Sequence, residues 1–213
     1  MIPKTEKEAD FVKSKLFSIC EIRPYLFIAG YGALTHQKVK ELGITHAVDA
    51  TNISKTQRTP DVEYLEVKID DNEGSDIKKY FNESASFIRK AKESLMDEKF
   101  SLMDENTLFE NSGDFGRFAG DGGKALVYCA AGISRSASIC MMYLVIEENV
   151  TLRDAFIEVG RARRIICPNL GFWRQMIDYE IEKRGATSVN LLNGMRRPIP
   201  DVYLYKSSLL QNA

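Results

Sequence analysis

The 213-residue sequence has almost no excess of charge of either sign. Its 29 basic and 30 acidic residues give a formal net charge of -1. A chain without a basic surplus is not expected to bind nucleic acid or an anionic membrane surface through its overall electrostatic field. Any anion that it binds must therefore be recognised by a local group of residues.

Cysteine is also scarce, with four residues at positions 20, 129, 140 and 167. These spacings contain no CxxC pair and do not form the disulfide framework of a small secreted domain. We therefore expect four reduced thiols, no metal site and no cofactor. Cys20, Cys140 and Cys167 are expected to be small apolar side chains of the core. Cys129 differs because of the residues that follow it.

The chain has only two histidines and one tryptophan. Neither His36 nor His46 has a carboxylate or a cysteine at metal-ligand spacing, so both are expected to be ordinary surface or hydrogen-bonded residues. Trp173 is expected to lie in the core.

Long apolar runs are absent as well. No segment approaches the roughly 18 apolar residues that a membrane-spanning helix needs. The first thirteen residues carry charges of both signs and no apolar stretch, which does not match a secretory signal. The sequence predicts a soluble protein of the cytoplasm, with the nucleus as a second compartment and no membrane partner.

Short apolar runs alternate with segments of helical periodicity along most of the chain, a pattern typical of an α/β domain. We expect strands at residues 24–30, 45–50, 64–69 and 125–128, and helices at residues 35–42, 77–96, 136–146, 152–161 and 171–184. The predicted domain covers residues 19–184. Residues 1–18 form an N-terminal extension, and residues 185–213 form a tail that we expect to be extended on the surface.

One segment interrupts this alternation. The pentapeptide Ser-Leu-Met-Asp-Glu occurs at residues 94–98 and again at 101–105, and a glycine-rich stretch follows up to residue 123. Loops of this length in a compact domain are uncommon. We interpret residues 94–123 as a surface insertion, with a regulatory or docking role as the alternative.

The chemistry-bearing feature is a loop between the last predicted strand and the apolar helix at 136–146, with the sequence Cys129-Ala130-Ala131-Gly132-Ile133-Ser134-Arg135. Backbone N–H groups that converge at a helix N-terminus hold a phosphate dianion well. Glycine permits the required backbone turn, and the two alanines leave the amides accessible. The arginine guanidinium can bond two phosphate oxygens at once. We name Cys129–Arg135 the phosphate loop, with residues 130–135 as the predicted phosphate-binding set.

A thiol at the centre of such a loop is predicted to be a nucleophile. The positive environment that binds phosphate favours the thiolate form of a cysteine, so Cys129 is predicted to attack the bound phosphorus. Negative charge that develops on the phosphoryl oxygens would be stabilised by Arg135 and the loop amides.

A leaving alkoxide or phenolate needs a proton, which a carboxylic acid on a neighbouring loop can supply. The strand predicted to end at Ile69 is followed by Asp70 and Asp71, and either one can be this acid. Ser136 directly follows the arginine. Its hydroxyl is predicted to form a hydrogen bond to the cysteine sulfur when water hydrolyses the phosphocysteine intermediate.

These residues resemble the dual-specificity protein phosphatases, whose loop reads His-Cys-x-x-Gly-x-x-Arg-Ser. The resemblance covers residues 19–184 and includes Leu42-Gly43-Ile44-Thr45-His46, Tyr143-Leu144 and Pro168-Asn169-x-Gly171-Phe172. It implies a mixed, roughly five-stranded sheet flanked by helices. It also implies hydrolysis of phosphotyrosine, phosphoserine and phosphothreonine, and it assigns the acid to Asp71.

Further segments are similar to a small atypical subgroup related to the MAP kinase phosphatases, which lacks a separate kinase-docking domain. These segments are Cys129 to Ser138, Ala162-Arg163-Arg164, Gly171 to Gln175 and Pro200-Asp201-Val202-Tyr203. This resemblance implies a phosphorylated protein substrate, such as a MAP kinase pathway component. It implies nothing about the oligomeric state.

The sequence departs from the family at two places. Residues 94–123 have no counterpart in short members, and Tyr128 stands where the family has the histidine that helps to shape the loop. A tyrosine has no imidazole N–H to donate, so the speed of turnover stays open.

Two alternative functions are therefore retained. The first is a phosphoprotein-binding module that is catalytically weak or silent. The second is a phosphatase of a phosphoinositide or an RNA 5′ phosphate, but such anionic substrates favour basic residues inside the loop, and Ala130, Ala131, Ile133 and Ser134 are uncharged. Arg164 could reach a second phosphate, or act as a cation near a helix C-terminus.

Overall fold

The computed structural model describes residues 10, 13–93, 123–194 and 196–204. A five-stranded sheet in the order β1-β2-β5-β3-β4 forms its centre. Its strands are β1 (Ile19–Arg23), β2 (Leu26–Gly30), β3 (Ile44–Asp49), β4 (Glu63–Glu66) and β5 (Lys124–Cys129). The edge strand β1 pairs antiparallel with β2, and the other pairs are parallel. The predicted mixed α/β fold is thus confirmed.

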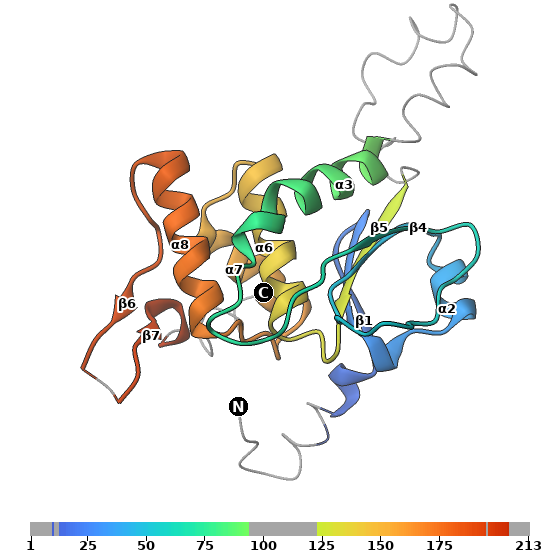
Figure 1. The fold of residues 1–213 in the computed structure, drawn as a ribbon, viewed down its shortest axis with the longest axis horizontal. Coiled ribbons are helices and arrows are strands. Elements are labelled where there is room, and N and C mark those ends of the chain that lie inside the picture. The colour runs from blue at the N-terminus through green and yellow to red at the C-terminus, as the bar shows by residue number, and fades with distance from the viewer. Residues whose placement is uncertain (1–9, 11–12, 94–122, 195, 205–213) are drawn as a thin grey trace, which may run out of the picture.

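Helices cover both faces of this sheet unequally (Figure 1). On one side lie α3 (Phe81–Glu93), α6 (Arg135–Glu147), α7 (Leu152–Ala162) and α8 (Leu170–Arg184), while the short α2 (His36–Glu41) lies on the other side. Successive β5 side chains alternate between the two faces, so Val127 and Cys129 join the larger core and Leu126 and Tyr128 join the smaller one.

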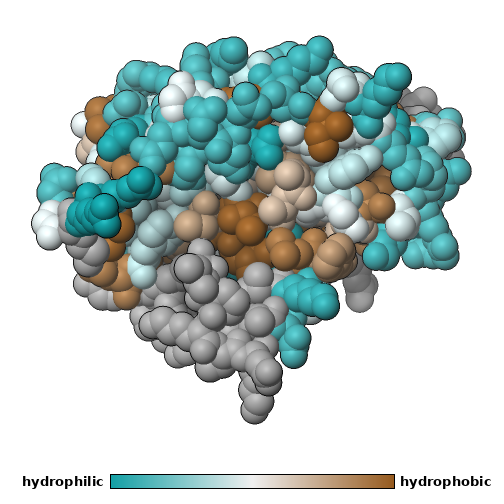
Figure 2. All heavy atoms as spheres, turned by 60° about the horizontal axis from the view of Figure 1, so that its bottom comes forward, coloured by the Kyte–Doolittle hydropathy of each residue, from teal (hydrophilic) through white to brown (hydrophobic). Residues whose placement is uncertain are grey.

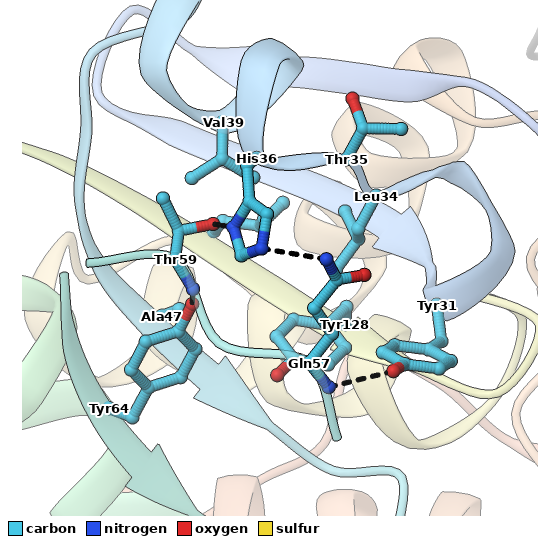
Figure 3. A pocket seen from close by; sticks show the side chains of 11 residues that line it. Tyr31, Leu34, Thr35, His36, Val39, Ala47, Gln57, Thr59, Tyr64 and Tyr128 are labelled. Carbon is cyan, nitrogen blue, oxygen red and sulfur yellow. Dashed lines mark hydrogen bonds between the residues drawn. The ribbon is translucent and has the colours of Figure 1, made fainter.

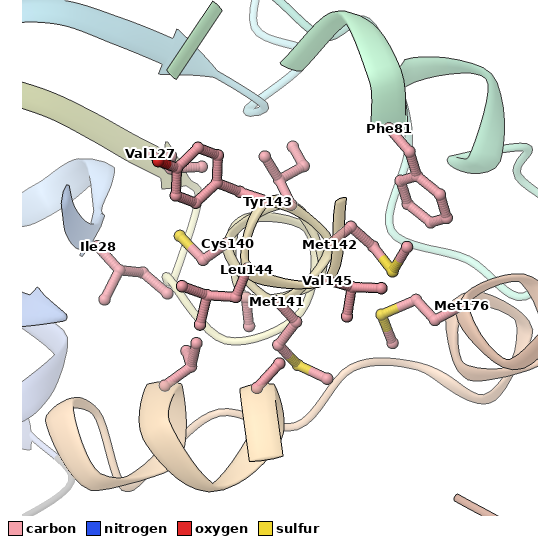
Figure 4. Packing of buried hydrophobic residues seen from close by; sticks show 14 of the residues in the cluster. Ile28, Phe81, Val127, Cys140, Met141, Met142, Tyr143, Leu144, Val145 and Met176 are labelled. Carbon is pink, nitrogen blue, oxygen red and sulfur yellow. The ribbon is translucent and has the colours of Figure 1, made fainter. Parts of the chain in front are cut away.

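The centre of the larger core is α6, which packs against α3, α7 and α8. Every residue from Arg135 to Val145 is buried. Figure 4 shows its side chains, such as Met141, Met142 and Leu144, pointing outward in all directions into apolar surroundings. A helix that is apolar all round is buried on all sides, as the sequence predicted.

Local signals set the ends of the other long helices. Thr151 and Asn169 cap α7 and α8 by accepting hydrogen bonds from backbone N–H groups of the first turn. Gly185 ends α8 in the left-handed conformation, with φ of +77°. These elements match the predicted helices to within a residue or two.

The larger differences between the predicted and observed elements lie in three places. Strand β1 was missed, because its residues show no clear alternation. Strand β4 covers Glu63–Glu66, so it begins one residue before the predicted strand at 64–69 and ends three residues earlier, although Val67 and Ile69 beyond it are buried. The predicted helix at 77–96 is divided into a 3-10 turn (Lys78–Tyr80) and α3, and residues 94–96 lie outside the described part. Apart from its last residue, the predicted insertion also lies outside it.

The described part of the tail corrects the prediction of a surface segment. It forms the two-residue strands β6 (Leu191–Leu192) and β7 (Ile199–Pro200), followed by a 3-10 turn (Asp201–Tyr203). Val189 and Val202 are fully buried in the larger core. The Trp173 indole N–H donates to the Tyr203 hydroxyl at 2.8 Å, and Trp173 lies in the core as expected. The sequence does not predict this burial, because the buried residues of the tail recur at neither helical nor strand spacing.

Within the described ranges, none of the helices has the length and apolar composition needed to cross a membrane. The same ranges hold no group of three or more His, Cys, Asp and Glu side chains placed to bind a metal ion.

Candidate active site

The site lies where the parallel strands β2, β3 and β5 end on the same edge of the sheet. Cys129 is the last residue of β5, and only 1% of its surface is exposed. Its sulfur lies 3.2 Å from the Gly132 nitrogen, which donates to it, and 3.3 Å from the Ser136 hydroxyl oxygen. The predicted nucleophile, loop amide and hydroxyl therefore meet at one point.

The phosphate loop turns back on the end of β2 through a glycine-dependent contact. Gly132 has φ of +70°, and a Cβ built there would lie 2.5 Å from the backbone of Ala29. The backbone is also close at Gly30, since a Cβ built there would lie 2.9 Å from the backbone of Ala131. The Tyr31 N–H donates to the Ala130 carbonyl at 3.2 Å. Only glycine fits the two positions where the chains cross.

The loop leads directly into α6, so the N-terminal end of this buried helix faces it. Unpaired N–H groups and the positive end of the helix dipole favour an anion at this place. Ser134, the residue before the helix, does not cap it with its side chain. Its hydroxyl donates instead to the Asp71 carboxylate at 2.7 Å.

Arg135 is buried beside the loop, with 7% of its surface exposed. One terminal nitrogen, Nη1, donates to the carbonyl oxygens of Thr51 at 2.8 Å and Ile69 at 3.2 Å. The Nε atom is buried without a hydrogen-bond partner among the described residues and lies 3.8 Å from Asp71 Oδ2. Arg135 is therefore held in place by backbone carbonyls and keeps a donor for a ligand.

The two candidate acids lie in different surroundings. Asp71 accepts hydrogen bonds from Ser134 Oγ at 2.7 Å and Asn169 Nδ2 at 2.9 Å, which connect it to the phosphate loop and to the start of α8. Asp70 is exposed, as Asp71 is, but its carboxylate accepts from Asn52 Nδ2 at 2.7 Å instead. The structure thus brings Asp71 to the phosphate loop, and its assignment as the acid stays a prediction from the family resemblance.

The loop that carries Asp71 is held by α8 through residues that the sequence did not single out for this role. A Cβ at Gly171 would lie 2.0 Å from the Glu73 carbonyl oxygen, so the loop rests directly on the helix backbone. The Gln175 side chain accepts from the N–H groups of Ile77 and Lys78 at 2.8 and 2.9 Å and donates to the Ser75 carbonyl at 2.8 Å. Both residues belong to the Gly171 to Gln175 motif, which was the available signal.

Tyr128 belongs to the smaller core, whereas Cys129 belongs to the larger one, and Figure 3 shows Tyr128 among the residues that line a small pocket. Its ring stacks on Tyr31 with a centroid distance of 6.1 Å. Its hydroxyl is buried and lacks a hydrogen-bond partner of good geometry within the described residues. Burial, and then the nearby Asp49 carboxylate, raise the pKa of Tyr128, so the phenol stays neutral. Tyr128 is linked to the phosphate loop through Tyr31, whose N–H donates to the Ala130 carbonyl.

The histidines have ordinary roles, as expected. His36 contacts the Thr59 hydroxyl at 3.1 Å and the Gln57 amide at 2.6 Å in the small pocket of Figure 3. His46 contacts the Thr45 hydroxyl at 2.9 Å and lies 3.4 Å from Glu63. Burial lowers the pKa of His46, which favours the neutral ring.

Comparisons with known proteins agree with this geometry. The family model described as "Dual specificity phosphatase, catalytic domain" matches residues 107–182. Mouse dual specificity protein phosphatase 14 is 31% identical over 204 residues, which cover 95% of this chain and 87% of that protein. The crystal structure of human DUSP28 shares the fold, with a TM-score of 0.63, 24% identity and coverage of 78% of this chain and 95% of that one.

A further similar structure is that of the human tyrosine phosphatase-like serine/threonine/tyrosine-interacting protein. It has a TM-score of 0.58, 28% identity and coverage of 78% of this chain and 97% of that one. The identity and coverage of the phosphatase 14 relatives decide the family. The chain is a protein phosphatase and belongs to the dual-specificity phosphatase family.

Proposed function

We propose that this protein hydrolyses phosphotyrosine and phosphoserine or phosphothreonine in proteins through a phosphocysteine intermediate on Cys129. The observation that carries the proposal is the position of the Cys129 sulfur, within 3.3 Å of the Gly132 amide and the Ser136 hydroxyl at the start of α6. A thiolate there would face a phosphorus atom held by the loop amides and Arg135.

In the first step, the Cys129 thiolate attacks phosphorus and the bond between phosphorus and the ester oxygen breaks. Asp71, as the protonated acid, gives its proton to the leaving oxygen. Arg135 and the loop amides hold the three remaining phosphoryl oxygens as negative charge spreads over them. The products of this step are the free hydroxyl of the substrate and phosphocysteine.

In the second step, water attacks the phosphocysteine and the bond between phosphorus and sulfur breaks. Asp71, now ionised, takes a proton from the water, while the Ser136 hydroxyl donates a hydrogen bond to the departing sulfur. Inorganic phosphate leaves and the thiolate is restored. Neither step is assigned to a metal ion, so we expect turnover to persist in the presence of a chelator.

The proposed partner is a phosphorylated protein. Its assignment to a MAP kinase pathway rests on the subgroup resemblance. The proposed cytoplasmic and nuclear location rests on the composition of the sequence alone. A chain that bound phosphoproteins without hydrolysing them would be the alternative module. Release of phosphate from a doubly phosphorylated threonine and tyrosine peptide, measured with a chelator present, tests the proposed activity directly.

The two aspartates give a matched test of the acid. Replacement of Asp71 by Asn is expected to lower kcat for an aryl phosphate by about 100-fold, because the leaving oxygen loses its proton donor. Replacement of Asp70 by Asn serves as the control and is expected to leave kcat within about twofold, since mutations away from the chemistry have small effects. If the Asp70 variant were the slow one, the acid assignment would be wrong.

Two substitutions at position 128 separate packing from hydrogen bonding. The Tyr128→Phe variant is expected to keep the activity and thermal stability of the native protein, because the hydroxyl that it removes has no partner at good geometry. The Tyr128→His variant is expected to raise kcat/KM severalfold, because it restores the family residue and its ring N–H donor. Steady-state kinetics near neutral pH measure both. A large loss in the Phe variant would show that the phenol hydroxyl is needed.

A further inference from the structure

Arg163 lies immediately after α7 and is fully buried. Its Nε donates to the Gly132 carbonyl at 2.7 Å, and its Nη2 donates to the Ala131 carbonyl at 2.9 Å. These two acceptors are consecutive carbonyl groups of the phosphate loop. A planar guanidinium can hold both at once, because its N–H donors form a rigid fork.

This contact fixes the direction of the loop amides. In a planar trans peptide, the C=O and the N–H of the next residue point in opposite directions. A bond to the Ala131 carbonyl therefore orients the Gly132 N–H, and a bond to the Gly132 carbonyl orients the Ile133 N–H. The Gly132 N–H does point to the Cys129 sulfur, at 3.2 Å. Arg163 thus turns the carbonyls outward and the amide donors toward the site.

The third nitrogen of the Arg163 guanidinium, Nη1, reaches the segment before β1 and also Cys20, the second residue of β1. Nη1 donates to the carbonyls of Lys15 at 2.8 Å and Ser18 at 3.1 Å, and lies 3.4 Å from the Cys20 sulfur. All these acceptors are neutral, and Arg163 makes no ion pair with a carboxylate in the described part of the chain. A buried cation without a neutralising anion adds positive potential to the loop that it contacts.

We infer that Arg163 is a positioning residue of the phosphate loop, which presets the loop amides for a phosphoryl group and fixes the loop to the segment at residues 15–20. This inference rests on the proposed function and extends it beyond the residues that touch the substrate. It assigns two buried arginines to the loop. Arg135 is the one that contacts the phosphoryl group, and Arg163 acts through the backbone.

The test compares Arg163→Met, Arg163→Lys and the control Arg161→Met, which removes an exposed charge from the same helix end. For each variant, kcat and KM for an aryl phosphate are measured. Protection of Cys129 from iodoacetamide by inorganic phosphate is measured by mass spectrometry of its peptide. Thermal unfolding shows which variants are folded.

The methionine variant is expected to lose about 100-fold in kcat/KM, with a raised KM as well as a lowered kcat. The phosphate concentration that half-protects its Cys129 from iodoacetamide, here called the protection constant, should rise about tenfold. The reason is that the loop amides bind the free anion as well as the transition state. The kcat/KM and the protection constant of the lysine variant should lie between those of the methionine variant and those of the native protein. Lysine keeps the positive charge but not the forked donors of the guanidinium. The control should match the native protein.

Two failures are distinguishable. If the native protein shows neither turnover nor phosphate protection, the proposed function fails and this inference fails with it. If the native protein shows both, and the folded Arg163 variants keep its KM and protection constant, the inference alone is overturned. The inference is also overturned if the Arg163 variants lose thermal stability but keep the protection constant of the native protein. Should the methionine variant not fold, the lysine variant decides.

Discussion

Replacement of Cys129 by Ser is expected to abolish hydrolysis of phosphotyrosine, phosphothreonine and aryl phosphate substrates, with kcat/KM lower by at least about 10,000-fold. A serine hydroxyl is a far weaker nucleophile than a thiolate, and no neighbouring base that could activate it contacts position 129 in the described structure. Hydroxyl and thiol are close in size, so the loop, Arg135 and the start of α6 should stay in place. The variant is therefore expected to bind inorganic phosphate and phosphopeptides while it hydrolyses neither.

The matched control for this variant is Cys167→Ser, which makes the same chemical change at a partly exposed thiol. It should keep native kinetics. Steady-state turnover together with calorimetric titration of a phosphopeptide separates the two quantities, namely hydrolysis and binding. Native activity in the Cys129 variant would exclude the covalent mechanism, whereas an inactive native protein that binds the phosphopeptide would point to the binding module.

Replacement of Arg135 by Ala is expected to lower kcat/KM by about 1,000-fold or more, by raising KM and lowering kcat together. The guanidinium is the one charged donor group that the proposal places on the phosphoryl oxygens. Its removal also leaves the carbonyls of Thr51 and Ile69 without the donor that holds them at 2.8 and 3.2 Å. The loops after β3 and β4 should therefore loosen as well.

A lysine at position 135 should restore only part of this loss, because an ammonium group cannot bond two phosphate oxygens in the plane of a fork. Arg89→Ala is a suitable control, since Arg89 lies on α3, is half exposed and pairs with Glu93 at 2.8 Å. Measured kcat and KM near the native values for the Arg135→Ala variant would remove Arg135 from the site.

The parts of the site that were predictable depend on residues close together in the sequence. The spacing from Cys129 to Arg135, the apolar strand before it and the apolar helix after it identify the phosphate loop without knowledge of distant contacts. The glycine at position 132 is also explained locally, because its left-handed backbone conformation favours glycine. The choice between Asp70 and Asp71 as the acid needed the family resemblance, and it stays a prediction; the bonds from Ser134 and Asn169 show only that Asp71 lies at the phosphate loop.

The parts that escaped prediction depend on contacts between distant segments. In the sequence, Arg163 is noted only as part of the Ala162-Arg163-Arg164 motif, and only the fold reveals that its guanidinium is buried against the phosphate loop. Gly171 needs to be glycine because the Glu73 backbone lies against it; the Gly171 to Gln175 motif marks the position but does not indicate this contact. The buried tail residues Val189 and Val202 escaped in the same way, since each fills a space formed by helices elsewhere.

In the proposed mechanism, the phosphoryl group passes through the Cys129 sulfur. The most direct measurement is acid quenching of the protein during turnover of an aryl phosphate, followed by mass spectrometry of its peptides. The Ser136→Ala variant suits this experiment, because loss of the hydroxyl 3.3 Å from the sulfur should slow breakdown of the intermediate. A phosphoryl group on Cys129 is expected in the quenched sample. Continued turnover with no label on Cys129, or with the label on another residue, would contradict it.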